Sequence, residues 1–121
     1  MKRIVPLLVC TVILFLAASV RADKLVVVAG GGDGIENVPA TKAKLNQPFG
    51  VDFDNRGNMY IVELKGGRVL KVDTKGILTI IGGTGMAGDK GDGGPAREAL
   101  FNGMHSLAVG PYNIIFLADT L

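Results

Sequence analysis

The stretch from Leu45 to Val72, LNQPFGVDFDNRGNMYIVELKGGRVLKV, decides the fold class of this chain. Its apolar residues fall into three short runs, and residues that accept turn dihedrals, mostly Gly, Asn and Asp, separate those runs. This alternation is typical of β-strands joined by tight turns. We therefore predict strands at 49–53, 59–64 and 68–72, and a fourth at 77–81 beyond the turn Asp73-Thr74-Lys75-Gly76.

The same pattern returns later in the chain, at the offset of 56 residues that separates Pro39 from Pro95. At this offset Asn46 meets Asn102, and Glu63 meets Asp119. Strands are expected again at 106–109 and 114–119, and Pro95 opens a segment that favours a single helical turn. A periodic all-β unit of about fifty residues indicates a β-propeller blade.

An apolar, β-branched run also precedes these units. It covers 25–29 and ends at Gly30-Gly31-Gly32, as the run at 77–81 ends at Gly82-Gly83. We expect an outer strand at 25–29, a first full blade over about 45–82 and a second, incomplete blade over about 101–121. Residues 23–121 would thus form part of a propeller.

The N-terminal segment has the features of a secretory signal. Met1 to Ala22 combines Lys2 and Arg3, an apolar run of about fifteen residues, and small or apolar residues before a cut after Ala22. That run is shorter than the roughly 20 residues of a spanning helix, so we expect cleavage rather than a stable membrane anchor. The protein would then be secreted or periplasmic.

Cleavage would change the charge balance of the chain. The 13 basic residues would fall to 10 against 11 acidic ones, so the net charge would be 10 − 11 = −1. A chain without basic excess has no electrostatic footprint for nucleic acid. The single cysteine, Cys10, would be removed as well, so packing alone must stabilise the fold.

The repeated sequence resembles that of a known family. LNQPFGVDFDNRGNMYIVEL, followed by RVLKVD and the strand ending in Ala-Asp-Thr at 118–120, is similar to NHL repeats, over nearly all of 25–121. The resemblance implies a propeller, commonly of six blades. The sequence departs from the family at Val62-Glu63-Leu64 and at Lys65-Gly66-Gly67.

Six blades of about fifty residues would need roughly 300 residues. We therefore expect a fragment of a longer protein, with a short chain that completes its ring by self-association as the alternative. In a closed ring, the run at 25–29 would complete the last blade. Unpaired strand edges in an isolated monomer predict association or aggregation.

His105 is the candidate metal ligand, and it is the only histidine. It precedes an inner strand, at the expected mouth of the central channel. The resemblance extends to peptidyl-hydroxyglycine amidating lyases of the same propeller group, in which this segment supplies zinc-binding histidines. A catalytic zinc takes about three protein ligands, and the matching residue of the first copy is Phe49, so a structural or channel-lining role is favoured.

Three further motifs are interpreted as loops. The run at 83–88 fits the dinucleotide pattern G-x-G-x-x-G, but glycines and acids follow it instead of a helix, so we expect no cofactor. Asp52 to Gly57 with Glu63 resembles a calcium loop, yet Arg56 occupies a ligand position, and we expect a hairpin turn with solvated acids. Asp89 and Asp92 could touch a cation but are expected to serve solubility.

These observations favour a binding or interaction scaffold, with a protein or small-molecule ligand at the propeller face and no required cofactor. The alternative is a fragment of a propeller enzyme, a metal-dependent lyase or a lactonase-like hydrolase, whose site residues lie mostly in other blades. A divalent metal remains open under that alternative. Fold alone cannot decide between them, because function depends on the site.

Overall fold

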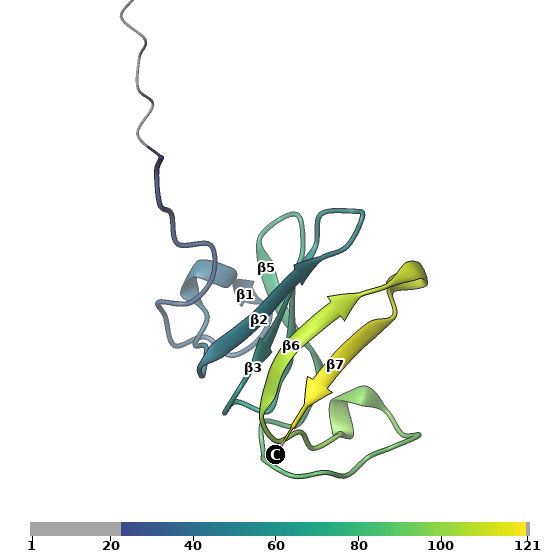
Figure 1. Cartoon of the computed structure of the whole chain (residues 1–121). Coiled ribbons are helices and arrows are strands. Elements are labelled where there is room, and N and C mark those ends of the chain that lie inside the picture. Colours follow the sequence, from purple (N-terminus) through teal and green to yellow (C-terminus); the bar gives the residue numbers. More distant parts are fainter. Residues whose placement is uncertain (1–22, 121) are drawn as a thin grey trace, which may run out of the picture.

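The computed structural model describes residues 23–120, and they form two antiparallel sheets with only single turns of 3-10 helix (Figure 1). The first sheet has five strands in the order β1-β5-β4-β3-β2, and the second pairs β6 with β7. The elements are β1 Val38–Pro39, η1 Ala40–Lys42, β2 Pro48–Phe53, β3 Met59–Glu63, β4 Val69–Val72, β5 Ile77–Gly82, η2 Ala96–Glu98, β6 Met104–Val109, η3 Pro111–Asn113 and β7 Ile115–Asp119. The all-β prediction is confirmed.

Strands β2 to β5 form a meander in which each strand pairs with the next one in the chain. Two of its turns have the same hydrogen-bond pattern. Asp54 and Asp73 each accept backbone N–H groups two and four residues ahead through Oδ1, at 2.9 Å in every case. Gly57 and Gly76 close these turns at φ 84° and 80°, a region that glycine occupies without steric cost.

The repeat is visible in the hydrogen bonds of the segments that precede β2 and β6. Lys44 N donates to Gly34 O at 2.7 Å, and 56 residues later Leu100 N donates to Lys90 O at 2.8 Å. Farther along, the acid that ends the second strand of each unit accepts the backbone N–H of an asparagine: Glu63 from Asn46 at 2.7 Å, and Asp119 from Asn102 at 2.9 Å. The offset read from the sequence is therefore also a structural repeat.

The apolar core has two parts, one on each face of the five-stranded sheet. The first face packs against the segment that leads into the blade, through buried Ile61, Leu70 and Leu78 with Ala40 and Ala43. The second face packs against the other sheet, through the residues Val62, Val69, Met104, Ile81, Phe101, Leu107 and Leu117. The two sheets are thus stacked face to face.

Strands β2 and β6 lie next to each other and run in the same direction across this stack (Figure 1). Gly50 of β2 approaches β6 so closely that an added Cβ would lie 2.9 Å from Ser106 Cα, the residue one repeat later. Asp52 accepts the backbone N–H of Val109 at 2.8 Å, which links the sheets by a hydrogen bond. The pKa of Asp52 is lowered, mainly because its carboxylate accepts this hydrogen bond and secondly because it accepts the backbone N–H of Phe53.

The outer strand expected at 25–29 is not formed in the structure. The segment is unpaired, and Leu25 to Val28 are exposed. The strands of the first sheet differ in coverage. β3 is mostly buried, whereas Phe49, Val51 and Phe53 of β2 are exposed.

The predicted signal peptide, with its cleavage after Ala22 and the residue Cys10, lies outside the described residues. Within residues 23–120, the structure contains no helix of the length and apolar character needed to span a membrane.

Candidate functional site

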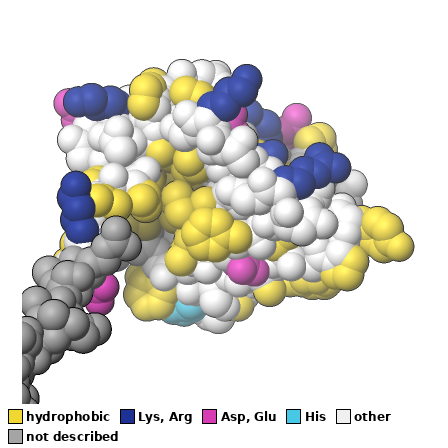
Figure 2. Space-filling view, turned by 90° about the horizontal axis from the view of Figure 1, so that it is seen from above, with side chains coloured by type: hydrophobic (Ala, Val, Ile, Leu, Met, Phe, Trp, Pro, Cys, Tyr) yellow, Lys and Arg dark blue, Asp and Glu magenta, His cyan; other side chains and the backbone are white. Residues whose placement is uncertain are grey.

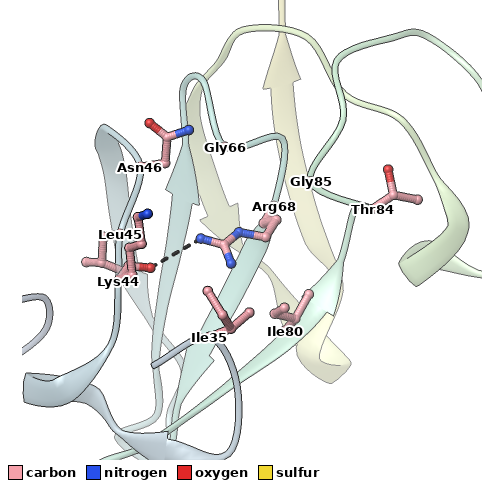
Figure 3. Close-up of a pocket in the computed structure, with 9 residues that line it drawn as sticks. All are labelled: Ile35, Lys44, Leu45, Asn46, Gly66, Arg68, Ile80, Thr84 and Gly85. Atoms are coloured by element: carbon pink, nitrogen blue, oxygen red, sulfur yellow. Dashed lines mark hydrogen bonds between the residues drawn. The ribbon is translucent and has the colours of Figure 1, made fainter. Parts of the chain in front are cut away.

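A recess lies where the β3–β4 turn faces the loop that follows β5 (Figure 3). Its volume is about 500 Å³, and its wall combines aliphatic side chains with hydrogen-bond donors. The lining residues are Ile35, Lys44, Leu45, Asn46, Gly66, Arg68, Ile80, Thr84 and Gly85. Figure 3 shows Ile35 and Ile80 beside the Arg68 guanidinium, which points toward the carbonyl of Lys44.

Arg68 is held in the recess wall by a buried carboxylate. Its Nε and Nη2 donate to the two oxygens of Glu63 at 2.6 and 2.8 Å, and Nη2 also donates to Lys44 O at 3.3 Å. Glu63 is fully buried, and the Arg68 side chain is 11% exposed. A planar guanidinium with two anchored edges is fixed in direction, and so it can present its remaining N–H groups to a ligand.

Gly66 is required where it stands, because an added Cβ would overlap the Glu63 carboxylate. The turn Lys65-Gly66-Gly67 therefore leaves room for the ion pair. The sequence-based interpretation treated Glu63 as a solvated turn acid, and this is wrong. The signal that could have found the pair is Arg68 itself, five residues ahead of Glu63 across a two-glycine turn.

Asp54 was also expected to be solvated, and this too is wrong. It is 8% exposed, and its Oδ2 accepts Asn58 Nδ2 at 2.7 Å and the Tyr60 hydroxyl at 3.0 Å. The Asn58 side chain is the main cause that lowers the pKa of Asp54 to about 2, against the opposing effect of its desolvation. Each carboxylate oxygen of Asp54 already accepts two hydrogen bonds from the turn and from β3. The turn is therefore a structural element and does not have the open geometry of a calcium loop.

His105 lies in β6, half-buried, one repeat after Phe49. The rings of these two residues meet edge to face, with centroids 5.6 Å apart. Nδ1 of His105 lies 2.7 Å from Thr120 Oγ1, and the Thr120 hydroxyl donates to Gly103 O at 3.2 Å. Because a hydroxyl has one proton to give, Thr120 accepts from Nδ1–H, and this tautomer leaves a lone pair on Nε2.

A lone pair on Nε2, with the other nitrogen held by an acceptor, is the arrangement of a metal-binding imidazole. The rest of a ligand set is not assembled around it: within residues 23–120, no three His, Cys, Asp or Glu side chains stand close enough to share a metal ion. The structure therefore presents one oriented candidate ligand, and the metal role of His105 stays a prediction.

The glycine-rich segment 83–94 forms a loop that is exposed except at Gly83 and Gly88. Asp89 and Asp92 are exposed in it, and the next helical element after Gly88 is the single turn η2. The loop thus has no helix N-terminus to face a pyrophosphate.

Comparison with protein-family models and with curated proteins finds no match for this chain.

Proposed function

We propose that the chain is part of an NHL-type β-propeller that is secreted or periplasmic and acts as a binding scaffold. The observation that carries the proposal is the recess beside β4, where a guanidinium fixed by a buried carboxylate stands among aliphatic side chains. The repeated hydrogen bonds and the stacked sheets support the propeller architecture.

The chemistry of the recess indicates the class of ligand. Lys44, Arg68 and the Asn46 amide offer donors and positive charge, and Ile35 and Ile80 offer apolar contact. Because Glu63 neutralises Arg68, the net positive charge of the lining comes from Lys44. Such a lining suits a carboxylate attached to a short apolar group, for example the C-terminus of a peptide.

The test is a titration of the ¹⁵N-labelled chain, followed by NMR, with the peptide Ala-Leu-Ala-Leu carrying either a free or an amidated C-terminus. We expect saturable shifts of the backbone N–H signals of Asn46, Gly66 and Thr84 with the free acid and much weaker ones with the amide. Lys44→Gln should weaken binding, whereas Lys75→Gln, in the turn between β4 and β5, should not. Equal shifts with both peptides, or none at the recess, would refute the carboxylate site.

The second candidate is a propeller enzyme with a metal-dependent site, and the orientation of His105 is the observation that favours it. Here His105 would contribute one ligand through Nε2, and a bound zinc would supply Lewis-acid chemistry. Zinc binding by the chain that is lost in His105→Ala would favour this candidate. Retained peptide binding without any zinc affinity would favour the scaffold.

A further inference from the structure

On one face of the first sheet the apolar side chains of β2 are exposed, whereas in the neighbouring β3 Met59 is half-buried and Ile61 is buried. Val51 and Phe53 of β2 are 57% and 58% exposed, and with Met59 and Ile61 of β3 they line a groove of about 380 Å³. Hydrophobic side chains also gather around a hollow in the space-filling view (Figure 2). We call the four residues Val51, Phe53, Met59 and Ile61 the leading face.

The equivalents of these four residues in the second unit are covered within the chain. One repeat later stand Leu107, Val109, Ile115 and Leu117, which are all half-buried. Leu107 and Leu117 pack against Val62 and Val69 of the first blade, and Ile115 joins Leu117 beside Ile81. Within the chain, side chains in these positions therefore pack against the opposite face of the first sheet, which carries Val62 and Val69.

The chain also has an uncovered example of that opposite face. On the far side of the second sheet, Ala108, Phe116 and Ala118 occupy the places of Asp52, Tyr60 and Val62 in the first blade. Phe116 is 59% exposed, and none of the three residues is charged. We call Ala108, Phe116 and Ala118 the trailing face.

Association through strand edges is disfavoured on the outer side of the first sheet. β1 pairs with β5 at Ile77 and Leu78, and beyond that pairing the N–H and C=O of Ile80 are bound by Glu36 and Arg97 at 3.2 and 2.8 Å. Glu36 and Arg97 also pair with each other, at 2.7 Å and 2.9 Å. An edge covered in this way does not recruit another strand. Within residues 23–120, β2 at the other edge of this sheet and both strands of the second sheet pair with one neighbour only.

We propose that the leading face of one copy binds the trailing face of a second copy, head to tail. The contact would resemble the packing that already joins the two sheets of one chain, but without counterparts of Val69, Ile81 and the Asp52–Val109 hydrogen bond. A head-to-tail contact uses two different surfaces, so it leads to rings or open chains rather than to an isologous dimer. The proposal rests on the repeat and the exposed faces, and it does not depend on the ligand of the recess.

The test is sedimentation velocity of the full chain over about 1 to about 300 µM, because a contact of this limited size is expected to be weak. Wild type should form dimers and larger species as the concentration rises. Phe53→Lys on the leading face and Phe116→Lys on the trailing face should each remain monomeric and weaken association at least tenfold. Met86→Lys, on an exposed residue of the glycine-rich loop, is the matched control and should associate like wild type.

Mixing the two variants tests the head-to-tail geometry directly. Phe53→Lys keeps its trailing face and Phe116→Lys keeps its leading face, so an equal mixture should form a 1:1 dimer and nothing larger. A mixture that stays monomeric, a wild type that stays monomeric, or variants that associate like wild type would each overturn the proposal. All variants share the same N-terminal residues, so association through that segment would survive both substitutions and be recognised. Circular dichroism checks that each variant is folded.

Discussion

Replacing Arg68 by Met should destabilise the fold strongly, because it leaves the Glu63 carboxylate buried without its counter-ion. Of the three N–H groups that Glu63 binds, two belong to Arg68, and the third is the backbone N–H of Asn46. Glu63 is fully buried, so water cannot replace the lost donors. Breaking a buried pair on one side costs about 3–5 kcal/mol. That is a large part of the roughly 5–15 kcal/mol that stabilises a typical domain.

The companion variants separate the charge from the shape of the side chains. Glu63→Gln keeps an acceptor for Asn46, and Arg68 can turn toward the recess and solvent, so we expect a loss of about 1–3 kcal/mol. The double variant Glu63→Gln with Arg68→Met should lose less than the sum of the single losses, with a coupling of about 0.5–3 kcal/mol. The reason is that no buried charge remains when both partners are replaced.

The assay is urea unfolding followed by far-UV circular dichroism, since the chain has no tryptophan. Arg56→Met, at an exposed arginine in the β2–β3 turn, is the control and should change the free energy of unfolding by less than about 0.5 kcal/mol. A loss below about 1 kcal/mol for Arg68→Met, or additive losses in the double variant, would refute this account of the ion pair.

The remaining predictions concern the turn between β2 and β3 and the histidine. The pKa of Asp54 is lowered to about 2 in the folded state, so its contribution to stability is complete above about pH 4 and is lost as the pH falls toward 2; acid unfolding of Asp54→Asn should show less of this dependence. Gly57→Val forces a β-branched residue to φ 84° and should cost about 1–3 kcal/mol in thermal unfolding, and an unchanged melting temperature would contradict the turn assignment. His105→Ala should cost less than about 1 kcal/mol, because the ring is half-buried and makes one hydrogen bond; a larger loss in urea would make it a core residue.

The strands could be predicted because their signals are local. The runs at 49–53 and 59–64 alternate with turn residues, and Gly57 and Gly76 mark turns that need a positive φ. The offset of 56 residues could be read from identical residues such as Asn46 and Asn102, without knowing that the backbone N–H of each is bound by an acid. Propensity and periodicity were sufficient for this part of the fold.

The burial of acids could not be predicted in the same way. Asp54 and Glu63 lie in a part of the sequence rich in turn residues, where carboxylates are usually solvated. They are buried because the folded chain brings the donors of Asn58, Tyr60 and Arg68 to them. The run at 25–29 shows the converse, since a sequence of strand-forming residues stays unpaired in the structure. Pairing is a tertiary property that propensity alone does not determine.

The meander of the first sheet has a consequence for how the protein folds. β2 to β5 pair only with strands that follow directly in the chain, so this part can form rapidly after short loop closures. The exception is β1, which must find β5 across the whole length of the meander: Val38 pairs with Leu78, and Asn37 N donates to Leu78 O at 2.8 Å. We therefore expect β1 to dock last during folding and to open first in native-state hydrogen exchange, with the Asn37 amide exchanging well before those of β3 and β4.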